Sequence, residues 1–198
     1  WAVVKRTVNS ATVRYIEYFD TLKVVSKNYA HFVDSGVHMS SGSAITEVTG
    51  LTHLHGKTIH VCIDGSIVEK TAVVTSTGTA ALSFSTGLHV HAGLPFRSYA
   101  QTCRIETQSR YGSGMGMAKR GHGKLFVWVH ETIGGEYGPD ISITEAISYS
   151  TGTALTTELQ EVDFPSDWDN DGYIWVIQQD PLPMTVVGYA PDFLVGDR

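Results

Sequence analysis

Two pairs of histidines have a spacing that could bind a metal ion. His53 and His55 stand two positions apart, and so do His89 and His91. On a β-strand such residues project from the same face, and imidazole nitrogens are common zinc ligands. His60 could supply a further nitrogen. Because no C-x-x-C or H-E-x-x-H pattern accompanies the pairs, we interpret them as polar positions on alternating strands and predict no metal site.

An acidic segment near the C-terminus resembles a calcium-binding loop. Residues 167–178 begin with D-x-D-x-D-G, which places Asp167, Asp169 and Asp171 in ligand positions. The twelfth position is Gln178, where the pattern requires a Glu that binds through two charged oxygens. No amphipathic helix precedes the loop. We therefore interpret the segment as a turn rich in Asp, Asn and Gly, and keep the three aspartates as the calcium candidates of the chain.

No catalytic arrangement stands out. The G-x-S-x-G turn of α/β-hydrolases is missing from the sequence. A glycosidase needs two carboxylates at a defined separation, which sequence spacing alone cannot establish. The acidic residues available for such a pair are Glu131, Glu136, Asp140 and Glu145. We predict that the chain is not an enzyme, that it has no catalytic residues and that it needs no cofactor.

Strand signals run along the whole chain, whereas helical spacing is confined to short segments. Asp64-Gly65 separates two alternating runs, and this dipeptide is the strongest short-range signal of a β-hairpin. Turn signals recur every 8–12 residues, which is typical of a β-sandwich or β-barrel. We predict an all-β fold in which a small β-barrel at 50–97 is inserted into a β-sandwich formed by 1–49 and 98–198.

One glycine-rich segment interrupts the strand pattern. Residues 111–123 read YGSGMGMAKRGHG and carry five glycines, which is typical of a long mobile loop. Methionine side chains adapt to irregular surfaces because they are unbranched and polarizable. The residues of this loop that we predict to contact a partner are Met115, Met117, Lys119 and Arg120. We expect a partner protein there rather than DNA.

Composition excludes several classes of protein. The chain has 198 residues, 42% of them hydrophobic and 17% charged, with 14 Lys and Arg against 20 Asp and Glu. The low charged content argues against disorder, and the net charge of −6 argues against nucleic acid as the main partner. Two cysteines cannot form a disulfide framework. No run approaches the length of a membrane helix, and the first residue, Trp1, suggests a fragment of a longer protein.

Four stretches, taken in order, resemble a known family. They are residues 1–20, residues 51–70 with 89–102, residues 121–139, and residues 167–193. Together they are similar to the C-terminal part of the tail nozzle proteins of short-tailed bacteriophages, also called tubular tail or stabilisation proteins. The middle stretch, which opens LTHLHG, resembles a small β-barrel module named after a half-domain of ubiquitin-activating enzymes. That label describes a fold and implies no ubiquitin chemistry.

The resemblance implies a structural role in the virion. Proteins of this family form a ring below the portal and adaptor through which DNA leaves the capsid. It implies a closed, sixfold ring of copies of the chain, contacts with tail adaptor and fibre proteins, and transient passage of DNA. It also implies assembly in the bacterial cytoplasm and no membrane insertion by this segment.

One alternative stays open at this point. A carbohydrate- or receptor-binding β-domain of a tail fibre or spike would have a similar composition. Aromatic side chains near loops could stack on sugar rings in such a domain. The candidates for this role are Tyr111, Tyr137, Trp168 and Tyr173.

Overall fold

The computed structural model is built almost entirely from antiparallel β-strands. It describes residues 1–18, 28, 32–104, 108–109, 112–113, 119–149, 154–165 and 172–195. These residues contain no α-helix, and a 3₁₀ turn, η2, occupies Thr52–Leu54. None of the helical segments described has the length or the apolar character needed to span a bilayer. The predicted all-β fold is confirmed.

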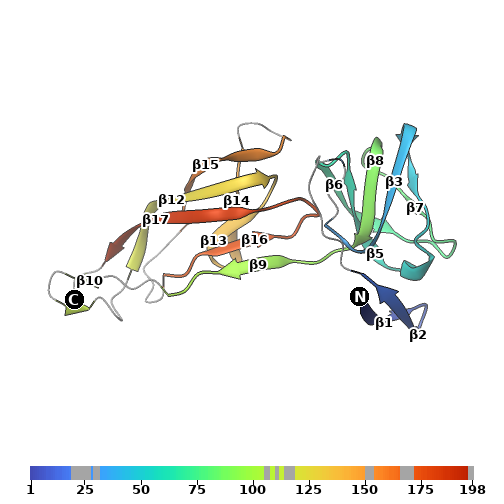
Figure 1. Cartoon of the computed structure of the whole chain (residues 1–198), viewed down its shortest axis with the longest axis horizontal. Helices are drawn as coiled ribbons and strands as arrows, with labels where there is room; N and C mark the ends of the chain where they lie inside the picture. The colour runs from blue at the N-terminus through green and yellow to red at the C-terminus, as the bar shows by residue number, and fades with distance from the viewer. Residues whose placement is uncertain are drawn as a thin grey trace. The chain divides into compact units, whose positions relative to one another are not determined.

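The chain divides into two compact units, whose strands are labelled in Figure 1. Unit 1 comprises Trp1–Phe96 and Asp180–Pro183, and unit 2 comprises Arg97–Gln179 and Met184–Arg198. Each unit has its own buried apolar cluster, as expected of compact domains.

A four-stranded sheet forms the centre of unit 1. Its strands follow the order β3-β8-β5-β6, and a two-stranded sheet pairs β4 with β7. The bounds are β3 Asp34–Ile45, β4 Glu47–Val48, β5 Thr58–Ile63, β6 Ile67–Val73, β7 Ala80–Ala81 and β8 Gly87–Leu94. The core lies on one face of the sheet and includes Val48, Leu51, Leu54, Ile59, Val61, Ile63 and Val90.

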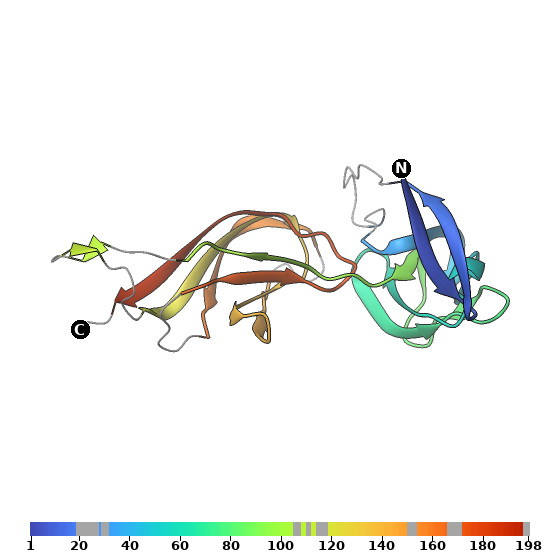
Figure 2. The same ribbon diagram turned by 90° about the horizontal axis from the view of Figure 1, so that it is seen from below.

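Two tight turns of unit 1 agree with the sequence signals. Asp64 and Gly65 have φ values of 48° and 67°, so both central residues are left-handed, as a type I′ turn requires. A second hairpin joins β1 (Ala2–Val8) to β2 (Ala11–Glu17) through Asn9 and Ser10, with φ values of 48° and 63°. Figure 2 shows the two strands of this hairpin side by side.

Unit 2 contains two larger sheets. One has the order β15-β12-β17 and the other β14-β13-β16-β9. The bounds are β9 Ser98–Gln101, β12 Lys119–Thr132, β13 Glu136–Asp140, β14 Ile143–Ala146, β15 Thr156–Asp163, β16 Trp175–Gln178 and β17 Val186–Val195. Two short strands, β10 (Gln108–Ser109) and β11 (Gly112–Ser113), pair with each other. Leu125, Val127 and Val129 of β12 pack in one core with Tyr137 of β13. Unit 2 is therefore sandwich-like.

Two features differ from the sequence-based predictions. β3 precedes the predicted boundary at residue 50, yet Val37 of β3 pairs with Ala92 of β8. The structure thus groups 1–49 with 50–96, whereas we predicted a barrel at 50–97 inside a sandwich of 1–49 and 98–198. Among the described strands of unit 1 the sheet is open rather than closed into a barrel. Local strand signals do not specify which distant strand supplies the hydrogen bonds, and this explains the difference.

Candidate functional site

The first histidine pair does not lie on a strand. His53 belongs to the 3₁₀ turn η2, and His55 follows the turn, so the same-face geometry predicted for the pair is wrong. His53 donates a hydrogen bond from Nε2 to the carbonyl oxygen of Ser35 at 2.8 Å. Its ring also makes an edge contact with Tyr15 of β2, with centroids 6.0 Å apart. His53 therefore holds the β1–β2 hairpin against the rest of unit 1.

The second pair does share a face of β8, as predicted. His91 stacks on His38 of β3 with ring centroids 4.2 Å apart, and His89 lies 6.3 Å from the same ring. Burial, together with the neighbouring charge of His89, lowers the pKa of His38. His91 Nε2 donates to the carbonyl oxygen of Asn28 at 2.8 Å. The rings lie parallel and stacked, which is a packing arrangement and not a convergence of nitrogens on one point.

His60 lies elsewhere in unit 1. Its Nδ1 atom is buried and has no hydrogen-bond partner among the residues that the structure describes. Burial lowers the pKa of His60, the positive charge of Lys70 lowers it further, and the negative charge of Asp180 opposes them. Lys70 and Asp180 form an ion pair with a distance of 2.5 Å between Nζ and Oδ1. No group of three or more His, Cys, Asp or Glu side chains that could hold a metal ion occurs in the described part of the chain.

Several predicted residues lie where the structure gives little information. Asp167, Asp169 and Asp171, the calcium candidates, fall outside the described residues, and so do Met115 and Met117 of the predicted assembly loop.

The end of that predicted loop is a strand. Lys119 and Arg120 begin β12, where their backbones pair with Val195 and Leu194 of β17. The prediction of a loop through residue 123 is therefore wrong for 119–123. Glycines at 121 and 123 suggested a turn, but β17 supplies hydrogen bonds that extend β12 through this region.

Of the carboxylates considered for catalysis, Glu136 and Asp140 take part in local hydrogen bonds. Glu136 accepts from Thr144 Oγ1 at 2.6 Å and from the amide of Gln179. Asp140 accepts from the backbone and hydroxyl of Ser142. These contacts stabilise the β13–β14 hairpin and its turn.

Tyr137 is buried, and the role of sugar platform predicted for it is therefore wrong. Its hydroxyl donates to the carbonyl oxygen of Asp163 at 2.6 Å and lies 3.4 Å from Glu145 Oε2. Burial, with the negative charge of Glu145, raises the pKa of Tyr137 to about 12. Tyr173 is half-buried, and Tyr111 and Trp168 lie outside the described residues.

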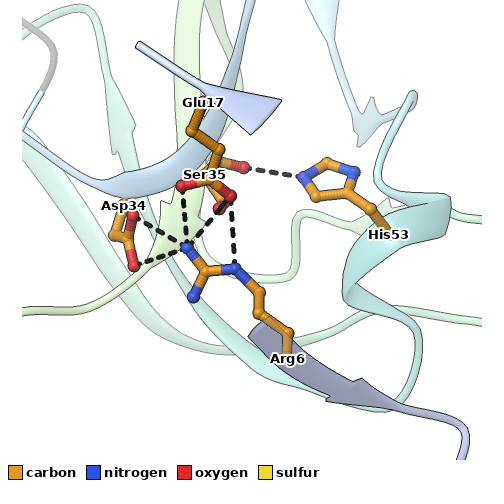
Figure 3. A network of polar contacts seen from close by, with 5 residues as sticks. All are labelled: Arg6, Glu17, Asp34, Ser35 and His53. Atoms are coloured by element: carbon orange, nitrogen blue, oxygen red, sulfur yellow. Dashed lines mark hydrogen bonds and ion pairs between the residues drawn. The ribbon is translucent and has the colours of Figure 1, made fainter. Parts of the chain in front are cut away.

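A polar network joins the β1–β2 hairpin to the start of β3 (Figure 3). Arg6 Nη2 donates to Glu17 Oε2 at 3.1 Å and to Asp34 Oδ2 at 3.0 Å. Ser35 Oγ donates to Glu17 Oε1 at 2.6 Å. Burial disfavours the charged form of Glu17 and so raises its pKa. The hydrogen bonds from Ser35 and Arg6 outweigh this effect, and the pKa of Glu17 is lowered. The network fixes one face of the hairpin on the start of β3, within the same unit.

The opposite face of this hairpin is exposed. We call it the hairpin outer face; it consists of Trp1, Val3, Lys5, Thr7, Thr12, Arg14, Ile16 and Tyr18. Val3 pairs directly with Ile16, whose side chain is 74% exposed. Trp1 is 89% exposed, and its ring lies 5.6 Å from that of Tyr18. Soluble proteins rarely leave such contiguous apolar groups in water without a partner.

A second exposed apolar face lies on unit 2. We call it the β12 outer face; it consists of Lys124, Phe126, Trp128, Leu159, Glu161 and Asp163. Trp128 and Leu159 are paired across β12 and β15 and are 53% and 61% exposed. Lys124 forms ion pairs with Glu161 at 3.2 Å and Asp163 at 2.9 Å. This combination of exposed apolar and charged side chains on one sheet face suits contact with a macromolecule.

Sequence reasoning missed both faces. The alternation along residues 1–8 indicates a strand, but Ala2, Val4 and Val8 make the other side equally apolar. The pattern therefore does not indicate which side meets water.

No protein-family model and no curated protein sequence matches the chain.

Proposed function

We propose that this chain is a structural component of a bacteriophage tail and forms part of a ring-shaped nozzle for DNA ejection. The observation that carries the proposal is the gathering of exposed apolar side chains on two sheet faces, one in each unit. Such faces suit protein–protein contact, whereas small-molecule sites are concave. The ordered resemblance of four segments to tail nozzle proteins supplies the kind of assembly.

Charge is consistent with a channel for DNA. Unit 2 has 7 Lys and Arg against 13 Asp and Glu, a net charge of −6, whereas unit 1 has 7 of each. Negative charge repels DNA phosphates and limits sticking during passage. In this proposal the chain assembles in the host cytoplasm, becomes part of the virion tail, and contacts adaptor and fibre proteins.

Electron microscopy of intact particles tests the proposal. Particles of the phage that encodes the chain would be labelled with an antibody raised against it, and the same antibody pre-adsorbed with purified chain would be the control. We expect label at the tail, with loss of label in the control. Particles that carry label on the capsid alone, or no label, would rule out the tail role.

The second candidate is a carbohydrate- or receptor-binding domain of a tail fibre or spike. It is favoured by Trp128, an exposed aromatic ring on a sheet face of the kind that stacks on sugars. A glycan array separates the two proposals, since only the second expects binding that is lost in Trp128→Ala. A reducing-sugar assay on the bound glycan distinguishes binding from hydrolysis.

A further inference from the structure

We propose that copies of the chain join head to tail, with the hairpin outer face of one copy seated on the β12 outer face of the next. This inference deepens the proposed ring and rests on it for the closure of the assembly. It concerns residues different from those of the glycine-methionine loop at 111–123.

The hairpin outer face carries two cations, Lys5 and Arg14, for which the described residues provide no acidic partner. Lys5 pairs directly with Arg14 across the two strands, and like charges in this position destabilise a strand pair. The face contains no acidic residue, because Glu17 points to the other side and bonds Arg6. A partner with exposed carboxylates would relieve the repulsion between the two cations.

The β12 outer face carries the complementary charge. Glu161 and Asp163 are both exposed, and Lys124 is the one cation of this face. One negative charge is therefore left over. Unit 2 as a whole has the same sign, since the net charge of the chain, −6, belongs to this unit.

The two faces also match in spacing. On the hairpin, the apolar pair Val3–Ile16 lies two residues from the pair Lys5–Arg14. On the other face, Leu159 lies two residues from Glu161. Two residues along a strand span about 7 Å. A single placement therefore brings the apolar pair of the hairpin onto Leu159 and Trp128 and a cation onto Glu161 at the same time.

Two different faces favour a head-to-tail assembly over a symmetric dimer. The contact is heterologous and repeats from copy to copy, and its closure into a ring comes from the proposed function. Seven residues of a two-stranded hairpin cover about 24 Å by 10 Å, which is small compared with a stable interface of about 800 Å² per partner. We therefore expect a weak contact between two free copies, strengthened when a ring closes.

Carbodiimide cross-linking of the native chain tests the contact directly, because this reagent joins amines to carboxylates that are paired. Isotope-labelled and unlabelled chains would be mixed, cross-linked and digested for mass spectrometry. We expect peptides that join Lys5 of one copy to Glu161 or Asp163 of another. The link from Lys124 to the same carboxylates is the internal control, since these groups already form ion pairs. If the Lys124 control links form and no link joins Lys5 of a labelled chain to a carboxylate of an unlabelled one, or the reverse, the proposal is overturned.

Charge reversal provides an independent test by sedimentation at low salt. Lys5→Glu/Arg14→Glu and Glu161→Lys/Asp163→Lys should each weaken self-association about tenfold or more. A mixture of the two variants should associate, because each supplies the face that the other needs. Lys57→Glu reverses an exposed charge outside both faces and should behave as the native chain. It is the control for the Lys5→Glu change in the first variant. Far-UV spectra would establish that every variant is folded.

The outcomes separate the contact from the tail role. Failure of the variant mixture to associate would overturn the head-to-tail contact, even where tail labelling succeeds. Association of the mixture, together with particles whose tails carry no label, would retain the contact and reject the tail role.

Discussion

Arg6 Nη2 lies 3.0 Å from Asp34 Oδ2, so a residue of β1 is tied to the first residue of β3. The same guanidinium holds Glu17 at the end of β2. An isolated two-stranded hairpin is marginally stable in water, and these contacts supply the support it needs. They also determine which face of the hairpin remains exposed, and so link a local ion-pair network to the proposed assembly surface.

Replacing Arg6 should loosen the hairpin. Arg6→Met leaves Glu17 and Asp34 without their cation, and loss of one partner from a buried pair costs about 3–5 kcal/mol. The Asp34 side chain is 45% exposed, so water screens part of this cost, and we expect about 1–2 kcal/mol. Amide hydrogen exchange of β1 and β2 would report the change. Arg14→Met, on the outer face, is the matched control and should not accelerate exchange, because it removes a cation that faces Lys5.

Acid should release the same hairpin. The Glu17 pKa is lowered from its ordinary value of 4.5, so the carboxylate contributes stability that is present above that value. This stability is lost as pH falls through the lower pKa of the folded state. We expect the protection factors of the β2 amides, which are corrected for the pH dependence of intrinsic exchange, to fall on acidification below about pH 4.5. Glu17→Gln should flatten this dependence, and a variant profile parallel to that of the native chain would contradict the prediction.

The sequence predicted local turns better than it predicted which strands pair with each other. Asp64-Gly65 specified a hairpin because both positions adopt positive φ, a local property. The pairing of Ser40 with His89 joins residues far apart in the chain and depends on tertiary packing. The exposed face at Val3 and Ile16 was not predictable either, since the contact of Arg6 with Asp34 decides which side turns inward.

The carboxylate of Glu69 should be important for the stability of unit 1. It is buried on β6 and accepts from the backbone of Ser83 at 3.2 Å, from the Ser83 hydroxyl at 2.8 Å, and from the backbone of Phe84 at 3.3 Å. Glu69→Ala would leave these donors unsatisfied, which costs about 1–3 kcal/mol. Urea unfolding would measure the loss. Glu47→Ala, an exposed Glu on β4, should change stability by less than about 0.5 kcal/mol.

Calcium should not stabilise the chain. A calcium loop at 167–178 would need the twelfth residue as a ligand, but Gln178 lies buried in β16 and its amide donates to the carbonyl oxygen of Ile133 at 3.0 Å. We expect equal melting temperatures in calcium and in EDTA, for the native chain and for Asp169→Ala. A calcium-dependent rise that Asp169→Ala abolishes would show that a site exists, because a ligand bound only to the folded state raises the melting temperature.

Gly138 of β13 should tolerate no side chain. A Cβ at this position would lie 1.9 Å from the carbonyl oxygen of Ile143 and 3.0 Å from its carbonyl carbon, so the backbone of β14 would have to move. Overpacking of this kind typically costs about 1–3 kcal/mol, and we expect Gly138→Ala to lower the free energy of unfolding by that amount. Gly188→Ala is the matched control, because a Cβ there meets nothing within 4 Å. It should be neutral or gain about 0.5–1 kcal/mol from a less flexible unfolded chain. Equal urea midpoints for the two variants would show that β14 moves aside freely and that the close approach at Gly138 is not structurally required.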